Sequence, residues 1–436
     1  MSERLEPVGV IGVGWVGLVT AACFAELGHQ VIARDIVPEK VEALSRGELT
    51  IHEPGLADLL RRNAERLTFT TDMDELLSGA RLLFTCVDTP PTYSGDADLS
   101  RVRSVVAELA NDSDHVLVMK STVPAGTGDS IRRDLPGLAY VSCPEFLKEG
   151  TAVADFMNPD RVVIGSDPGD EEAAAAVAKL YEPLGGEILH TDVASAEMIK
   201  LASNAFLATK ISFINEIANV CEEVGADVGQ VAQGMGLDER IGSSFLRAGI
   251  GYGGSCFPKD VSALKMLAGN TGYHFQLLTA VIEVNELQKR RVVGKLEKHL
   301  GSLIGKRIAL LGLAFKADTD DMREASSLVL AARLQGEGAE VVAFDPVAAE
   351  RAQQMLSSVE MADSALQALE GADAAVLVTE WREFAELDWR DAAARMARPF
   401  VVDGRNFLDA DALVEAGFEY EGIGTAARGL APAATD

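Results

Sequence analysis

The chain has 436 residues, a length that predicts two or three domains because a single hydrophobic core seldom serves so many residues. Its hydrophobic content of 48% and charged content of 24% are typical of a folded globular protein. The net charge of −28 disfavours nucleic acid or an anionic membrane as a partner, because the field of the whole chain repels phosphate groups. A small anion held locally by Arg and Lys remains compatible with this charge.

The five cysteines form no CxxC pair and no zinc-ligand spacing, so no metal site is expected. An odd number of cysteines in a chain of this length is typical of a reducing compartment. The opening residues, MSERLEPVGVIGVG, lead directly into a predicted strand without the pattern of a signal peptide. No apolar run has the length of a membrane span. We therefore expect a cytoplasmic protein.

Strands and helices alternate in the first part of the chain. The sequence predicts a short apolar strand over 8–12, a helix from about 16 to 27 after a glycine-rich turn, and a second strand over 31–35. Further apolar runs predict strands at 82–87, 116–120, 139–142 and 161–165. This alternation indicates an α/β fold with a doubly wound parallel sheet.

Between about 195 and 300 the pattern changes to helices alone. Residues 196–225, AEMIKLASNAFLATKISFINEIANVCEEVG, are apolar on nearly every side. A helix of this kind is expected to be buried, and a subunit interface is the favoured place for it.

At residue 307 the opening pattern returns. RIALLGLAF, a helix near 326–335 and the strand VVAFD repeat the first βαβ unit, and VLVTEW and FVVDGRN supply later strands. The second copy lacks the glycine triplet. We therefore predict two Rossmann-like doubly wound domains joined by a long central helix and a helical dimerisation region, with a disordered tail. The predicted boundaries are 1–194, 195–304, 305–427 and 428–436.

A GxGxxG motif follows the first predicted strand and opens the first helix. Its residues are Gly12, Val13, Gly14, Trp15, Val16 and Gly17. The glycines allow a tight turn, close approach of the backbone to a pyrophosphate, and close packing of helix on strand. The alternative is a glycine turn with no ligand, which the position between strand and helix disfavours.

Asp35 strengthens the prediction of a dinucleotide site. It ends the second strand, where a carboxylate accepts hydrogen bonds from an adenosine ribose. The same carboxylate repels a 2′-phosphate, so NAD is favoured over NADP. Arg34 is adjacent, but alternation along the strand points it to the opposite face.

Cys256 lies in the segment GIGYGGSCFPKDV, with four glycines before it and Pro258 after it. Pro258 suits the first position of a helix, so Cys256 is expected at a helix N-terminus, where the dipole favours a thiolate. Asp260 follows one turn later on the same side. A small buried thiol is the alternative, but such a thiol needs no glycine-rich approach. The pattern therefore favours a nucleophile.

Lys200 and Asn204 lie one turn apart on the long apolar helix. Burying an ammonium group costs several kcal/mol unless a partner is present, and stabilising an oxyanion is one reason to accept that cost. Asn204 could donate to the same oxygen. The alternative is a lysine on a solvated face. Residues 144–150, PEFLKEG, follow a strand end, where sheets of this kind bind ligands, although a charged loop can also be merely solvated.

Eight motifs occur in the order found in the UDP-glucose/GDP-mannose dehydrogenase family. They are GVGWVG, TIHEPGL, STVPAGT, PEFLKEGTAVADFMNPDRVVIG, AEMIKLASNAFLATKISFINE, GYGGSCFPKD, LGLAFKADTDDMRE and DGRN. From about residue 8 to 425 the chain resembles this family. The FPKD after Cys256 and the run NAFLATKISFINE are most similar to its UDP-glucose branch.

The resemblance implies an NAD-binding first domain, a UDP-sugar-binding last domain and specific roles for single residues. The catalytic set would be Cys256 as nucleophile, Lys200 and Asp260 for protons and the oxyanion, and Asn204, Glu145 and Thr122 around a catalytic water. NAD would contact the glycine motif, Asp35, Lys40, Thr89, Thr122, Glu149 and Arg323. UDP-glucose would contact Glu145, Phe146, Leu147, Lys148, Glu149, Lys200, Asn204, Phe245, Arg247, Gly253, Phe315, Lys316 and Arg405. Arg240 resembles an arginine lent to a neighbouring subunit's site, which implies a homodimer or larger homo-oligomer.

The implied reaction is a double oxidation of UDP-glucose to UDP-glucuronate. The first hydride leaves C6 for NAD⁺ as Lys200 or a linked water takes the hydroxyl proton. Cys256 adds to the aldehyde, and a second oxidation gives a thioester that water hydrolyses. Two residues depart from the family pattern: Trp15 replaces a usual tyrosine, and Cys143 stands where asparagine is common, which places a second thiol near the site.

Three other functions remain open from the sequence. The same chemistry could act on GDP-mannose or a UDP-N-acetylhexosamine. A single-oxidation dehydrogenase of the 6-phosphogluconate type would need no thiol, so the segment around Cys256 disfavours it. A non-catalytic nucleotide-sugar sensor would be expected to lack Cys256 or Lys200, and both are present.

Overall fold

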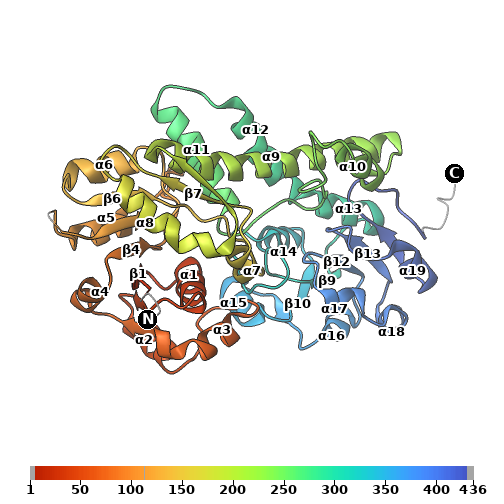
Figure 1. Ribbon diagram of the computed structural model, residues 1–436. Coiled ribbons are helices and arrows are strands. Elements are labelled where there is room, and N and C mark those ends of the chain that lie inside the picture. Colours follow the sequence, from red (N-terminus) through yellow and green to blue (C-terminus); the bar gives the residue numbers. More distant parts are fainter. Residues whose placement is uncertain (1–4, 112, 430–436) are drawn as a thin grey trace, which may run out of the picture. The chain divides into compact units, whose positions relative to one another are not determined.

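The computed structural model describes residues 5–111 and 113–429. They form two compact units. The first runs to Ser203 and includes Ser262–His274, and the second takes Asn204–Val261 and the residues from Phe275 onward. Two helices, α9 (Val193–Val224, the long green helix of Figure 1) and α11 (Phe257–Asn270), contribute residues to both units. Among the described residues, no helix is both long enough and apolar enough to cross a bilayer.

The first unit is built around an eight-stranded sheet with the order β3-β2-β1-β4-β5-β6-β7-β8. Its strands are β1 (Val8–Ile11), β2 (Val31–Arg34), β3 (Leu67–Thr70), β4 (Leu82–Thr85), β5 (Val116–Met119), β6 (Ala139–Ser142), β7 (Arg161–Gly165) and β8 (Glu187–Thr191). Leu82 and Phe84 pack into one hydrophobic cluster and Leu83 into another. Both faces of the central strands are therefore buried, which explains their unbroken apolar sequences.

Helices on both faces of the sheet complete the first unit. They are α1 (Trp15–Glu26), α2 (Pro38–Ser45), α3 (Leu56–Arg62), α4 (Met73–Gly79), α5 (Ser100–Ala107), α6 (Thr127–Asp134), α7 (Ala152–Met157) and α8 (Glu171–Tyr181). The sheet differs from the prediction because it is not wholly parallel. β7 pairs antiparallel with β6, and β8 runs parallel to β7. The connecting helix α7 has six residues, about 9 Å of helix, too short to return the chain to the opposite edge of the sheet.

The second unit repeats the pattern with a six-stranded parallel sheet in the order β11-β10-β9-β12-β13-β14. Its strands are β9 (Arg307–Leu311), β10 (Glu340–Phe344), β11 (Glu360–Met361), β12 (Ala374–Leu377), β13 (Phe400–Asp403) and β14 (Glu419–Glu421). Its further helices are α10 (Val228–Gly236), α12 (Gln276–Gln288), α13 (Arg291–Leu300), α14 (Ser326–Gly336), α15 (Ala349–Met355), α16 (Ala365–Leu369), α17 (Arg382–Ala385), α18 (Trp389–Arg395) and α19 (Ala410–Glu415). The predicted second Rossmann-like copy is confirmed.

The long helix α9 is not buried on all sides within one chain, and its predicted burial in a subunit interface remains a prediction. Ile214 and Ala218 pack into the core of the second unit. By contrast, Phe206 is 65% exposed, Phe213 49% and Val220 57%. These three residues are seven positions apart, so they lie along one side of the helix and form an exposed apolar stripe.

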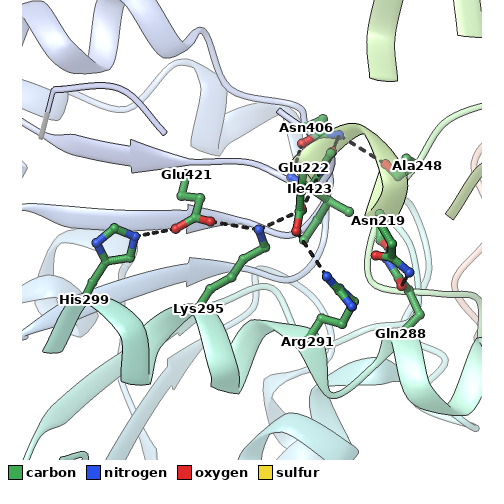
Figure 2. A network of polar contacts seen from close by, with 12 residues as sticks. Asn219, Glu222, Ala248, Gln288, Arg291, Lys295, His299, Asn406, Glu421 and Ile423 are labelled. Carbon is green, nitrogen blue, oxygen red and sulfur yellow. Dashed lines mark hydrogen bonds and ion pairs between the residues drawn. The ribbon is translucent and has the colours of Figure 1, made fainter. Parts of the chain in front are cut away.

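A network of buried charges ties three elements of the second unit together (Figure 2). Lys295 on α13 pairs with Glu222 of α9 at 2.7 Å and with Glu421 of β14 at 2.9 Å. Arg291, one turn before Lys295, donates to Glu222 at 3.2 Å, and the ring of His299 contacts the Glu421 carboxylate closely. The network therefore fixes the end of α9 against the edge strand β14.

The tail predicted to be disordered begins with a residue that is held in place. Arg428 exchanges two backbone hydrogen bonds with Tyr420, and its guanidinium pairs with Asp411 at 2.6 Å. The prediction is therefore wrong for Arg428. The rest of the tail, 430–436, lies outside the described residues.

Candidate active site

The turn after β1 brings backbone groups into close contact. Gly12 has a φ of 90°, a region that favours glycine, and a Cβ at Gly17 would lie 1.8 Å from the carbonyl oxygen of Gly12. Gly14 directly precedes α1, and the nearest described atom to a Cβ there would be a carboxylate oxygen of Asp88 at 3.9 Å. An open glycine turn at a helix N-terminus fits the pyrophosphate of a dinucleotide.

Asp35 lies beside this turn and is buried. One carboxylate oxygen accepts a hydrogen bond from the amide of Val13 at 2.9 Å and pairs with the Lys40 ammonium at 3.2 Å. Arg34 points away from them and pairs with Glu108 at 3.0 Å. The structure thus places a carboxylate, and not the neighbouring guanidinium, where a ribose would lie against the glycine turn.

We expect this carboxylate to set the cofactor preference. The kcat/KM for NAD⁺ should exceed that for NADP⁺ by about 100-fold or more, because a 2′-phosphate beside Asp35 is a like-charge contact that costs several kcal/mol. Asp35→Ala should narrow the gap mainly by lowering kcat/KM for NAD⁺. The exposed Asp58→Ala on α3 is the matched control and should leave both values unchanged. Equal kcat/KM for the two cofactors in the unmutated protein would contradict the assignment.

Glu53 links the glycine turn to the loop that follows β6, a connection that the sequence did not predict. The Trp15 indole donates to Glu53 at 2.9 Å, and the amides of Gly150 and Ala152 donate to the same carboxylate at 2.8 Å each. Glu53 belongs to the motif TIHEPGL, which marks it as a family position. Its partners are distant backbone amides, which leave no pattern of their own in the sequence.

Lys200 and Glu145 form a buried ion pair in the first unit. The Lys200 Nζ lies 3.0 Å from a Glu145 oxygen, and both side chains are at most 6% exposed. The second oxygen of Glu145 accepts from the amide of Leu147 at 2.6 Å. Phe146 lies beneath this pair, with Lys200 Nζ 5.4 Å and the Arg161 guanidinium 3.8 Å from its ring centre. The buried ammonium expected on α9 therefore has its partner in the loop after β6.

Other predicted residues of the first unit lie on neighbouring strand ends. The hydroxyl of Thr89 donates to the carbonyl of Thr122 at 2.7 Å, which joins two predicted cofactor contacts. Glu149 is buried in the loop after β6. Lys148 in the same loop is mostly exposed, and its ammonium pairs with Asp155 of α7 at 3.1 Å. Its predicted contact with the sugar remains a prediction.

Cys256 directly precedes α11, and its carbonyl accepts the helical hydrogen bond from the amide of Asp260 at 2.9 Å. The helix begins at Phe257, so Pro258 is its second residue and not its first. The glycines before Cys256 serve close packing more than flexibility. A Cβ at Gly253 would lie 2.2 Å from a backbone oxygen, and one at Gly254 would lie 2.7 Å from the Phe315 ring.

Asp260 connects the start of α11 to α9 within the second unit. Its side chain is 1% exposed, and one carboxylate oxygen accepts from the Asn204 amide at 2.6 Å. The other oxygen pairs with the Lys259 ammonium at 2.7 Å. Asp260 thereby fixes the amide of Asn204, whose predicted contacts with the oxyanion and the catalytic water remain predictions.

The predicted sugar-nucleotide residues of the second unit gather around the same segment. Phe245 adopts a φ of 64°, rare for an aromatic residue, and its ring packs on Phe257 at 6.1 Å. Arg405 donates to three backbone carbonyls, those of Gly251 at 3.0 Å, Phe315 at 3.1 Å and Val378 at 2.8 Å. Arg405 thus holds the glycine segment and the Phe315 loop together. The positive φ of the partly buried Phe245 marks local strain of the kind that collects at functional sites.

The remaining predicted cationic residues are each engaged within the second unit. Arg240 pairs with Asp238 at 2.6 Å, Arg247 donates to the carbonyl of Asn406 at 3.2 Å, Arg323 pairs with Asp321 at 2.8 Å, and the Lys316 Nζ lies 5.5 Å from the Phe315 ring centre.

Cys256 differs from the other four cysteines because it alone is partly exposed. Burial raises the pKa of Cys23 and of Cys86 to about 12, so both stay as thiols. Cys143 is fully buried, with its sulfur 3.8 Å from the hydroxyl of Tyr181. The described residues contain no cluster of three His, Cys, Asp or Glu side chains suited to a metal ion.

Asp345 follows β10 as Asp35 follows β2, but its surroundings differ. One oxygen accepts from the amides of Leu313 and Ala314 at 2.6 and 3.0 Å and from the Trp381 indole at 3.1 Å. Two more backbone amides donate to the other oxygen. A carboxylate has about four acceptor positions, so these donors leave no place for a ribose hydroxyl. The second copy is therefore unsuited to the adenosine half of a dinucleotide.

Comparison with known proteins agrees with this division of sites. Residues 6–185, 194–287 and 309–410 match the NAD binding, central and UDP binding domains of the UDP-glucose/GDP-mannose dehydrogenase family. UDP-glucose 6-dehydrogenase TuaD of Bacillus subtilis is 44% identical, covering 98% of this chain and 95% of its own, and the Pseudomonas aeruginosa UDP-glucose 6-dehydrogenase is 46% identical, covering 95% and 96%. The UDP-glucose dehydrogenase structure from Pyrobaculum islandicum superposes with a TM-score of 0.90 at 37% sequence identity, and the match covers 98% of this chain and 99% of that one. A UDP-D-ManNAc dehydrogenase structure from Pyrococcus horikoshii superposes with a TM-score of 0.83 at 29% identity, and the match covers 97% of this chain and 100% of that one. The chain belongs to the UDP-glucose/GDP-mannose dehydrogenase family.

Proposed function

We propose that the chain is an NAD-dependent UDP-glucose 6-dehydrogenase that converts UDP-glucose to UDP-glucuronate through a thioester on Cys256. The arrangement around Cys256 carries this proposal. Its thiol is partly exposed directly before α11, and the buried Asp260, hydrogen-bonded to Asn204, follows one turn later. Five free thiols suit a cytoplasmic enzyme, since that compartment is reducing.

The chain's own residues divide the work of the reaction as follows. Two NAD⁺ molecules, bound in succession, would supply the hydride acceptors for the two oxidations. Lys200, held by Glu145, stabilises the C6 oxygen as a linked water takes its proton. The Cys256 thiolate adds to the aldehyde carbon to form a thiohemiacetal, and loss of the second hydride leaves a thioester. Water held by Glu145 and Thr122 attacks that thioester and passes a proton to Asp260. Asp260 then gives this proton to the Cys256 sulfur as the sulfur departs from the carboxylate product.

UDP-glucose is favoured over other nucleotide sugars by similarity. The relatives named for UDP-glucose match this chain more closely than the solved dehydrogenase named for UDP-N-acetylmannosamine. The segment Phe257-Pro258-Lys259-Asp260 also resembles the UDP-glucose branch. GDP-mannose and UDP-N-acetylhexosamines are the competing substrates, and a panel of nucleotide sugars separates them.

The number of NADH molecules formed tests the thioester mechanism directly. With limiting UDP-glucose, the purified protein should form two NADH per sugar, with UDP-glucuronate as the product, because the thiol retains the aldehyde between oxidations. Absorbance of NADH and chromatography of the sugar nucleotides provide the measurement. One NADH per sugar with free aldehyde would instead indicate a single-oxidation dehydrogenase.

We also propose that the enzyme is a homodimer whose interface covers the exposed apolar stripe of α9. Phe206, Phe213 and Val220 repeat at seven residues, the spacing of a helix that packs along a partner helix. Leu277 and Leu287 of α12 are also more than half exposed. Contiguous apolar surface of this kind is rare on a monomer and typical of an interface, and a second copy presents the same stripe.

Arg240 is proposed to serve the site of the partner subunit, since its side chain is 88% exposed in its own chain. We expect inactive Arg240→Ala and Cys256→Ala proteins to regain activity when their subunits are mixed, because each mixed dimer contains one intact site. Recovery should approach about a quarter of the activity of the unmutated protein, since half of the dimers are mixed and each has one working site. Phe213→Asp in both proteins should prevent dimer formation, measured by sedimentation, and abolish this recovery. Exchange without recovery would place the action of Arg240 in its own subunit.

A further inference from the structure

Glu197 is a buried carboxylate on α9 that none of the assigned roles uses. It lies three residues before Lys200, and only 2% of its surface is exposed. One oxygen accepts from the amide of Gly126 at 2.8 Å. The other accepts from the amide of Gly128 at 2.8 Å and from the hydroxyl of Tyr140 at 3.2 Å. Its donors are thus two amides and a hydroxyl. They orient the Glu197 carboxylate by hydrogen bonds, but none of them carries a positive charge to compensate its own.

Gly126 ends the loop between β5 and α6 that carries Thr122, and Gly128 lies in the first turn of α6. The start of this loop is fixed by Ser121, whose hydroxyl donates to the carbonyl of Val87 at 2.7 Å, and by the bond from Thr89 to the Thr122 carbonyl. Its far end is fixed by Glu197. Thr122 therefore lies between two anchors, and Glu197 is the one on α9.

The loop fits closely against α9 and β6 near this carboxylate. Gly126 has a φ of 94°, which favours glycine, and it precedes α6. A Cβ at Gly128 would lie 2.5 Å from Val193 and 2.7 Å from the Tyr140 ring. Glycine serves the two donor positions differently: at Gly126 it permits the positive φ, and at Gly128 the lack of a Cβ leaves room for Val193 and Tyr140.

The same turns of α9 hold a second catalytic loop through Lys200. Residues three apart on a helix share a face, so Glu197 and Lys200 project from neighbouring positions. Lys200 holds Glu145 in the loop after β6, as described above. The start of α9 therefore acts on both groups that are proposed to hold the attacking water. Glu197 holds the end of the loop that carries Thr122, and Lys200 pairs directly with Glu145.

We propose that Glu197 is a positioning residue that sets the Thr122 loop for hydrolysis of the thioester. This inference rests on the proposed function. Displacing a catalytic loop by about 1 Å can slow a chemical step a hundredfold. Thr122 is also a predicted contact of NAD, so its displacement should raise KM for NAD⁺ as well, whereas hydride transfer at saturating NAD⁺ depends on Lys200, Cys256 and the bound cofactor. Loss of the carboxylate should therefore affect hydrolysis more than the two hydride transfers.

The protonation state of Glu197 offers an independent readout. Burial raises its pKa to about 7, although the two glycine amides and Tyr140 lower it. The charge of Asp129 on α6 raises the pKa of Glu197 further. Of the charges near Tyr140, Arg132 lowers the pKa of its hydroxyl and Asp167 raises it. Glu197 should lose its proton near neutral pH, and only the carboxylate form accepts from both amides with full strength. Hydrolysis should consequently slow as the pH falls through about 7.

Glu197→Gln tests the proposal, with the exposed Glu172→Gln on α8 as the matched control. In the Gln variant one oxygen becomes an NH₂ group that faces an amide donor. We expect kcat to fall about tenfold to a hundredfold with little change in KM for UDP-glucose. A rapid phase of two NADH per site should persist, and mass spectrometry of acid-quenched protein should detect the sugar-acid adduct on Cys256. The fall in kcat near pH 7 should disappear in this variant.

Glu197→Asp provides a second variant that retains the charge but shortens the reach. It should show a smaller loss of kcat and keep the pH dependence. An unchanged kcat in Glu197→Gln, or loss of the rapid phase together with a matching fall in melting temperature, would overturn the positioning role. If the unmutated protein itself forms one NADH per sugar, the proposed function fails, and this inference fails with it.

Discussion

Cys256→Ala is expected to lower formation of UDP-glucuronate by about 10⁴-fold or more, as removal of a nucleophile does in enzymes of other folds. Cys143→Ala should keep the yield of two NADH per sugar, because Cys143 is fully buried against Tyr181 and has no access to substrate without local opening. Cys143→Asn, which restores the residue common in the family, should also be active.

The two thiols are also separated by their reactivity. Brief treatment with iodoacetamide, followed by mass spectrometry, should modify Cys256 first, and NAD⁺ with UDP-glucose should protect it. Cys256 is partly exposed at a helix N-terminus, and both features favour a reactive thiolate. Faster alkylation of Cys143, or a Cys143→Ala protein that stops at the aldehyde, would show that the nucleophile has been assigned to the wrong residue.

Lys295→Met is expected to destabilise the second unit by about 3–5 kcal/mol, because it leaves the buried carboxylate of Glu421 and the partly buried one of Glu222 without their shared cation. The apparent melting temperature should fall by roughly 10 °C. Figure 2 shows why the effect is large: one ammonium group joins two carboxylates from different elements. Lys298→Met, an exposed position on the same helix, is the control and should change little.

The penalty for losing Lys295 should depend on pH. Burial alone would raise the pKa of Glu222, but Lys295, the Gly424 amide and Arg291 outweigh it and hold the pKa below its ordinary value. A carboxyl whose pKa is depressed on folding stabilises the protein above its unfolded pKa, and that stability is lost as the pH falls through the folded pKa. Denaturant titrations should therefore show the difference between the two proteins narrowing below about pH 4.5. A difference that stays constant down to pH 3 would exclude Glu222 as its source.

The alternation of apolar strands and helices predicted both sheets, because buried parallel strands require unbroken apolar runs. Patterns of this kind also predicted the glycine turn, Asp35 and the position of Cys256 before a helix. They did not predict the direction of β7, which depends on the length of α7. They also missed the edge strands β3, β8 and β11, whose residues are partly exposed, and β14, which has only three residues. Hydrophobic periodicity carries little information about such elements.

The carboxylates that organise the site were harder to identify from the sequence. Glu53 and Glu197 act on backbone amides about 70 to 100 residues away, and an amide donor leaves no residue type to recognise. The glycines before Cys256 suggested a flexible backbone. The structure shows instead that Gly253 and Gly254 have no room for a side chain, because other groups lie against them. A glycine in sequence does not distinguish freedom of the backbone from lack of space.

The indole of Trp381 on Asp345 has a consequence for ligand discrimination. A chain with two similar nucleotide-binding sheets risks exchanging its ligands, because each half of a dinucleotide resembles a sugar nucleotide. The Trp381 indole donates a hydrogen bond to the Asp345 carboxylate and, as part of the same chain, cannot diffuse away. A ribose that displaced it would leave the indole N–H without an acceptor. Asp345 is therefore not available to the adenosine ribose of a dinucleotide, so high concentrations of NAD⁺ need not reduce the occupancy of the second sheet by the sugar nucleotide.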